Sequence, residues 1–113
     1  MTAKHNFTAQ QNATFGSDII YKDASDVVVD LTDYTAEMDI RYGSKKGKLA
    51  IQLDTENGGI TFYNGEIQIR MTAEQTLSLK AQPCYYDLLL KKNGSVWRIL
   101  EGKFNVLEGV TKP

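Results

Sequence analysis

The residue types that carry most enzyme and metal chemistry are sparse in this chain. His5 is the only histidine and Cys84 the only cysteine among 113 residues. A zinc site needs several His or Cys ligands at set spacings, so these counts exclude one. A Ser–His or Cys–His pair for nucleophilic catalysis is not expected either, because the one histidine lies in a strand-like N-terminal segment. Cys84 falls on the apolar side of its segment, which is typical of a small core residue.

Carboxylates form the other groupings that could do chemistry. Asp26, Asp30 and Asp33 could offer oxygen ligands to calcium, but their spacing is not that of an EF-hand loop. Turn residues that bond their own backbone amides are the favoured interpretation. Glu37 and Asp39 share one strand face and could form a glycosidase pair, although solvated strand charges explain them at least as well and are the favoured interpretation. We therefore predict no enzyme, with no catalytic residues, no metal and no cofactor.

Charge and hydropathy limit the classes of partner. Lys and Arg number 13 and Asp and Glu 14, which gives a net charge of −1 and a pI of about 5.8. A nucleic-acid-binding protein normally shows a basic excess. No apolar run approaches the ~18 residues of a membrane span, and the first residues hold no apolar stretch of the signal-peptide kind. We expect a soluble protein made in a cytoplasm, with no nucleic-acid and no membrane partner.

Alternating apolar residues predict the elements that must carry these side chains. Between Tyr34 and Tyr42, one parity holds Tyr, Ala, Met, Ile and Tyr, while the other holds Thr, Glu, Asp and Arg. A period of two is typical of a strand with one buried face and one solvated face. Similar segments recur, and we expect strands near 6–9, 14–22, 27–29, 34–42, 48–53, 60–63, 66–72, 84–91 and 96–107.

Turn and cap residues separate these segments. Asn64–Gly65 and Asn93–Gly94 predict tight hairpins, and Thr72 with Gln75 predicts the capping box of a one-turn helix. Gly16–Ser17 disturbs the alternation of its segment, which favours a bulge or a strand that changes sheets. The pattern predicts one domain over residues 1–113, an all-β, immunoglobulin-like antiparallel β-sandwich of about seven to eight short strands. A small closed barrel is the alternative.

Four apolar residues are expected outside this core. The parity of segment 84–91 places Tyr85 and Leu89 outward, and that of segment 96–107 does the same for Trp97 and Ile99. The Asn93–Gly94 turn brings the two segments together, so the four residues would form one exposed patch. Such a patch usually marks a contact with another chain. Cover by a loop or by the N-terminal strand is the alternative, and a bulge would swap the faces.

Several segments resemble a known family when read in order. They are KHNFTAQQNATF from residue 4, VVVDLTDYTAEMDIR from residue 27, YYDLLL from residue 85 and VWRILEGKFNVLEGVTK from residue 96. Together they resemble small virion proteins of tailed bacteriophages and, more distantly, the N-terminal domains of phage baseplate upper proteins. The resemblance implies an immunoglobulin-like β-sandwich that forms a structural part of the particle. This chain has Asp33 where family members commonly have Gly, and it has Leu89 and Trp97 at positions that are usually polar in the family.

The resemblance implies a non-enzymatic structural protein of the virion. We expect a small adaptor or peripheral module of the tail or baseplate, with capsid decoration or a neck position as alternatives. Other virion proteins would be its partners, and it could also form a homo-oligomer within a symmetric assembly. Trp97, Ile99, Tyr85 and Leu89 are the predicted interface residues, since aromatic side chains dominate binding hot spots. Its place would be the virion, after synthesis in the cytoplasm of the host bacterium.

A carbohydrate-binding module for adsorption to the host is a further alternative. Its mark would be exposed aromatic side chains along a groove, and Tyr42, Tyr63 and Trp97 are the candidates.

Overall fold

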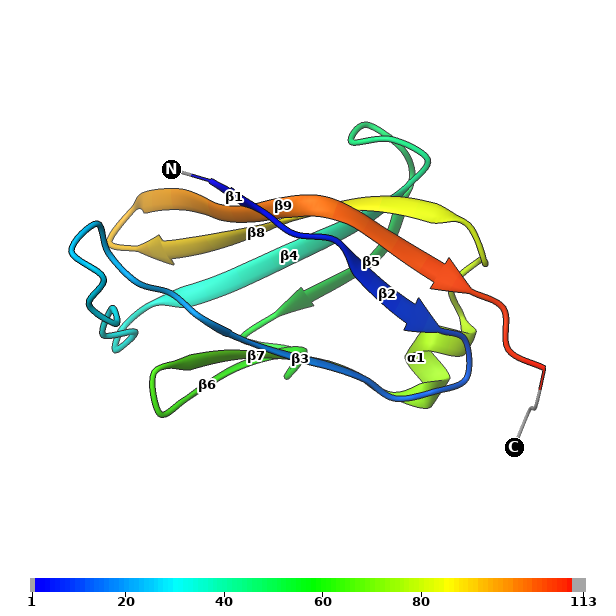
Figure 1. The fold of residues 1–113 in the computed structure, drawn as a ribbon, viewed down its shortest axis with the longest axis horizontal. Helices are drawn as coiled ribbons and strands as arrows, with labels where there is room; N and C mark the ends of the chain where they lie inside the picture. The colour runs from blue at the N-terminus through cyan, green and yellow to red at the C-terminus, as the bar shows by residue number, and fades with distance from the viewer. Residues whose placement is uncertain (1, 111–113) are drawn as a thin grey trace.

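Two β-sheets pack face to face in the computed structural model, which describes residues 2–110 (Figure 1). The large sheet has the strand order β1-β9-β8-β4-β5, and β2 also pairs with β9. The small sheet has the order β3-β7-β6. The large-sheet strands are β1 (Ala3–Lys4), β2 (Phe7–Gln10), β4 (Thr35–Tyr42), β5 (Leu49–Asp54), β8 (Pro83–Lys92) and β9 (Ser95–Leu107). The small-sheet strands are β3 (Phe15–Ile20), β6 (Ile60–Tyr63) and β7 (Glu66–Met71).

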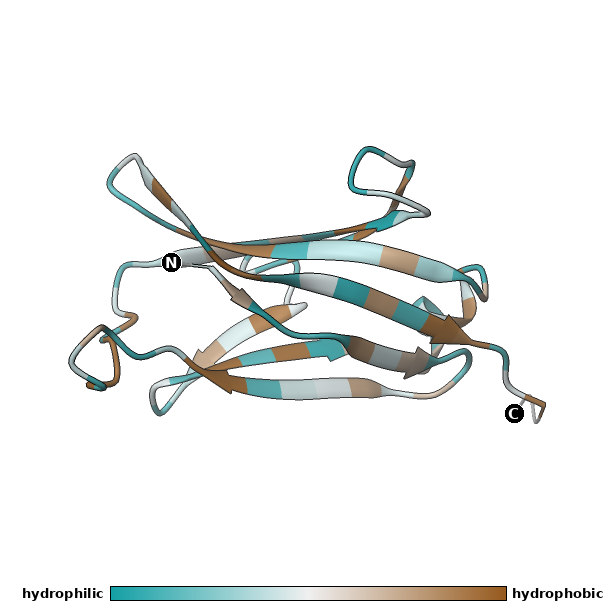
Figure 2. Cartoon of the chain, turned by 45° about the horizontal axis from the view of Figure 1, so that its top comes forward, coloured by the Kyte–Doolittle hydropathy of each residue, from teal (hydrophilic) through white to brown (hydrophobic). Residues whose placement is uncertain are grey.

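The core lies between the sheets and is made by one parity of each strand. Figure 2 shows hydrophobic and hydrophilic residues alternating along the strands. The most deeply buried large side chains come from both sheets, namely Met38, Ile40, Leu53, Ile60, Ile67, Ile69, Met71, Leu88, Leu90 and Phe104. Cys84 is buried among them, as its parity predicts. The sandwich expected from the alternation is therefore confirmed.

The N-terminal segment pairs in parallel with its neighbour, whereas the other paired strands are antiparallel. β1 and β2 pair in parallel with β9, with Phe7 opposite Phe104. The two strands break at His5, whose carbonyl oxygen accepts a hydrogen bond of 2.7 Å from the Tyr86 hydroxyl. Gly102 lies directly beneath this break, and a Cβ there would overlap the His5 carbonyl. A glycine is therefore required for the N-terminal segment to approach β9.

The predicted turns and helix cap are confirmed. Asn64–Gly65 and Asn93–Gly94 have positive φ at both residues, as type I′ hairpin turns need. The short helix α1 (Ala73–Leu77) carries a complete capping box between Thr72 and Gln75. The buried Thr76 hydroxyl oxygen lies 2.9 Å from the Ala13 carbonyl oxygen and 3.2 Å from its amide nitrogen, so it ties the helix to the start of β3.

Two local predictions were wrong. Residues 27–29 form no strand, because only Val28 makes an isolated bridge, to Lys22. Gly16 and Ser17 stay in continuous register with Arg70 and Ile69 on β7, so β3 has no bulge there. The small Gly16 instead leaves room for the Arg70 side chain, whose Cδ would lie 3.3 Å from an added Cβ.

Candidate functional site

A bulge in the β8–β9 hairpin separates the four residues predicted to form one patch. Leu88 lies opposite Leu100 but Leu89 opposite Arg98, so Ile99 is the extra residue on β9. Both Ile99 and Leu100 are buried, and Ile99 is only 6% exposed. A bulge reverses parity between its two sides. The expectation that Ile99 faces outward is therefore wrong.

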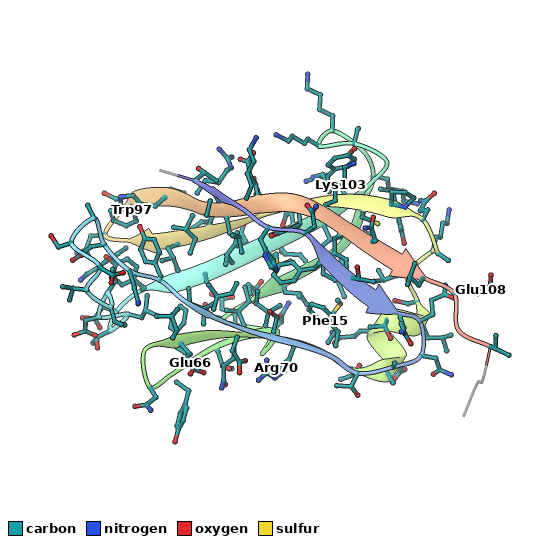
Figure 3. All side chains as sticks on the ribbon, in the orientation of Figure 1. Phe15, Glu66, Arg70, Trp97, Lys103 and Glu108 are labelled. Carbon is teal, nitrogen blue, oxygen red and sulfur yellow. The ribbon has the colours of Figure 1, made fainter. Side chains whose placement is uncertain are left out.

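Trp97 also leaves the predicted face. It lies opposite Leu90, a buried residue, so it sits on the inner side of the large sheet near its end. Its ring is 5.8 Å from that of Tyr34, and 42% of the residue remains exposed. Figure 3 shows Trp97 on β9 at one end of the sandwich. Its exposure is as predicted, but it does not share a surface with Tyr85 and Leu89.

Tyr85 and Leu89 do lie on the outer face of the large sheet, as predicted. Both are half-buried, and they line a hollow of about 470 Å³ above β4, β8 and β9. The rest of its lining is Tyr86 and six charged side chains, from Asp39, Arg41, Lys45, Asp87, Arg98 and Glu101. The connection between β4 and β5 rises above the sheet at one side (Figure 1), and Lys45 reaches from it to Glu101 at 3.5 Å.

The strand registers order these charges into rows. Asp39, Asp87 and Glu101 lie directly opposite one another across β4, β8 and β9, and we call them the acidic row. Two residues further along the sheet, Arg41, Tyr85 and Lys103 lie opposite one another in the same way, and we call them the basic row. Like charges directly opposite each other destabilise a sheet, so the acidic row needs compensating cations.

Cations within the chain meet that need. Arg41 approaches Asp39 at 3.3 Å, and Arg98 donates a hydrogen bond of 2.8 Å to Asp87. The bond to Asp87 raises the pKa of Arg98. At the border of the face, a bond of 2.8 Å to Glu37 likewise raises the pKa of Lys91. Both shifts favour the charged form of the cation.

The three candidate glycan contacts, Tyr42, Tyr63 and Trp97, divide between the two ends of the sandwich. At one end Tyr34 and Tyr63 line a second, shallower depression of about 460 Å³, and Trp97 lies against Tyr34. Lys92 Nζ sits 5.0 Å from the Tyr34 ring centre. Tyr42 lies at the opposite end of β4, where its hydroxyl accepts a hydrogen bond from the Lys80 amide at 3.0 Å. The three predicted glycan contacts therefore do not form one groove.

The remaining candidates for chemistry are structural. Asp30 Oδ1 accepts hydrogen bonds from the amide and hydroxyl of Thr32, which lower the pKa of Asp30. This is the self-bonded turn predicted for that segment. Burial raises the pKa of Cys84. Among residues 2–110, no group of three His, Cys, Asp or Glu side chains is arranged to hold a metal ion, and no helix is long and apolar enough to span a bilayer.

Comparison with known proteins identifies the fold. No family model and no curated protein matches the chain. Among solved structures it is similar to the extracellular domain of the voltage-gated sodium channel beta4 subunit, described as a parallel homodimer with a role in cell–cell adhesion. The TM-score is 0.50 at 8% identity, over 95% of this chain and 93% of that one. At this identity the likeness carries the fold alone, and it confirms the predicted immunoglobulin-like sandwich.

Proposed function

We propose that this chain is a non-enzymatic structural protein that works by docking onto other proteins. The observation that carries the proposal is the outer face of the large sheet. Within the described residues no strand or helix packs over this face, and its hollow exposes Tyr85 and Leu89 among paired charges. Tyr85 and Leu89 flank Asp87 of the acidic row, so the face mixes apolar area with paired charges, as non-obligate protein–protein interfaces do.

The resemblance to tailed-phage virion proteins supplies the setting of the proposal. We place the chain in the virion, as a small adaptor or peripheral module of the tail or baseplate. Capsid decoration and a neck position remain the alternatives. Copy number separates them, because symmetric sites are filled according to their symmetry. A head-shell position requires hundreds of copies, whereas six to a few dozen suit the neck or baseplate.

A matched pair of variants tests the docking face. Leu89→Glu places a carboxylate on the outer face of the large sheet, opposite Glu37. Ile20→Glu does the same on the small sheet, where Ile20 is 52% exposed and lies opposite Glu66. Each change sets one new acid against an existing one, so their costs to folding are similar in kind.

The assay is incorporation into particles assembled with the variant as the sole source of this chain. We expect Leu89→Glu to remain folded and to be depleted from purified particles at least tenfold. Ile20→Glu should be incorporated as the parent chain is. Normal incorporation of a folded Leu89→Glu chain, or absence of the parent chain from particles, would overturn the proposal.

Glycan binding is a second candidate, favoured by the depression between Tyr34 and Tyr63. Aromatic rings beside Asp30 and Asn64 would offer both stacking surfaces and hydrogen-bond groups to a sugar. A glycan array with the isolated chain tests this candidate, with Tyr63→Ala as the variant expected to abolish any signal. If the parent chain binds no glycan on the array, glycan binding is excluded as its function.

A further inference from the structure

We propose that the outer face of the large sheet binds a second copy of this chain in a two-fold symmetric pair. This inference deepens the proposed function and rests on it, because it uses the same face. Its basis is the arrangement of the acidic row beside the basic row, at a spacing of two residues along three strands. Two residues of strand correspond to about 6.7 Å.

The two rows make the face complementary to itself. Consider a two-fold axis that lies in the contact plane, runs perpendicular to the strands and passes midway between the two rows. Rotation about it sets the strands of the second copy antiparallel to those of the first. It therefore places the acidic row of each copy over the basic row of the other. In an isologous contact each such pairing occurs twice. Every strand then faces its own equivalent, so the pairs can be read from the registers.

Three contacts follow from this operation. Asp39 of one copy faces Arg41 of the other on β4, and Glu101 faces Lys103 on β9. On β8, Asp87 faces Tyr85, whose hydroxyl can donate a hydrogen bond to the carboxylate. A partner with a different sequence would need positive charge opposite the acidic row and negative charge opposite the basic row. A second copy of this chain already has that pattern, so we propose a second copy as the partner.

The whole faces carry little net charge. The acidic row contributes three negative charges, and Arg41, Lys45, Arg98 and Lys103 contribute four positive ones. Each face is therefore close to neutral at +1, so attraction between two copies comes from the row-to-row pairing and not from opposite net charges. Complementary charges of this kind favour encounter and fix the register of docking more than they raise affinity. The association should accordingly weaken as salt screens the charges.

The size of the face indicates a weak pair. Four strands and about seven residues along them cover roughly 400 Å² per copy by ordinary strand spacings. Stable complexes bury ~800 Å² per partner, so this face alone belongs with transient contacts. We expect a dissociation constant of about 0.1 mM, at which neighbouring copies held in one assembly would still pair.

Reciprocal charge reversal provides the test. In Glu101→Lys homodimers, lysine meets Lys103, and in Lys103→Glu homodimers, glutamate meets Glu101. A mixture of the two variants can form a heterodimer in which both contacts are restored. Glu66→Lys on the small sheet makes the same change in net charge as Glu101→Lys and is the control. Lys103 and Glu66 lie on opposite layers of the sandwich (Figure 3).

Sedimentation velocity between about 10 µM and 1 mM measures the outcome, at low salt and at ~0.5 M salt. We expect the parent chain and Glu66→Lys to dimerise as concentration rises, and each single variant to weaken dimerisation at least tenfold. The mixture should recover it to within threefold of the parent. A parent chain that stays monomeric at 1 mM, single variants that dimerise normally, or a mixture that is not rescued would each overturn the second copy as occupant.

This outcome is separable from that of the proposed function. A monomeric parent chain whose Leu89→Glu variant still fails to enter particles removes the second copy but leaves docking onto other proteins. Normal incorporation of Leu89→Glu removes the docking proposal whatever the sedimentation result.

Discussion

Replacing Ile99 with alanine tests the β9 bulge, which buries Ile99 and Leu100 side by side and turns Glu101 and Lys103 outward. Ile99 is 6% exposed and belongs to the buried core, although the simple alternation of β9 places it outside. Truncation of a buried Ile or Leu to Ala costs 2–5 kcal/mol. Because Ile99 lies near the end of the core and keeps slight exposure, we expect the lower part of that range, about 2–3 kcal/mol. For a chain of 113 residues, this corresponds to a fall in Tm of roughly 8–15 °C.

Leu89→Ala is the matched control, since it removes a similar side chain from the adjacent strand. Leu89 is half-buried on the outer face, so its truncation should cost under ~1.5 kcal/mol. Urea titration followed by circular dichroism measures both values, and an unchanged m-value for each variant would show that the folded state keeps its extent. Equal losses, or a larger loss for Leu89→Ala, would refute the bulge and return Ile99 to the surface.

Four further changes address other parts of the molecule. Trp97→Ala should leave the chain folded and cost about 1–2 kcal/mol in urea titration, because the ring is only partly covered and packs against one tyrosine; a chain that no longer folds would place Trp97 in the core. Cys84→Ser should cost about 1–3 kcal/mol by burying a hydroxyl, and the parent thiol should resist aqueous thiol reagents until unfolding, since burial also raises its pKa. Gly102→Ala should release the N-terminal segment from β9, and hydrogen exchange should show loss of protection confined first to β1 and β2. Asp30 stabilises the fold above its unfolded-state pKa and loses that contribution as pH falls through its lower folded pKa, so the acid limb of a stability–pH profile should be shallower for Asp30→Asn.

Local signals in the sequence were sufficient for most of the fold. The alternation of β4 predicts which of its side chains are buried, and Ala36, Met38 and Ile40 are. The Asn-Gly turns determine their hairpins because their positive φ values match the twist of paired strands. The parallel pairing of β2 with β9 was not predictable in this way. It depends on a contact between residues about a hundred positions apart, where the chain passes over Gly102.

The outer-face rows show why the candidate site was harder to predict than the fold. If β8 and β9 paired regularly from the Asn93–Gly94 turn onward, with no bulge, Glu101 would lie opposite Tyr86, a buried residue. The extra residue at position 99 shifts the register by one and sets Glu101 opposite Asp87 instead. The residue at the bulge gives no sequence signal for it, because isoleucine is common in regular strands. The acidic row, the outward position of Glu101 and the burial of Leu100 beside Ile99 are therefore three consequences of one register shift.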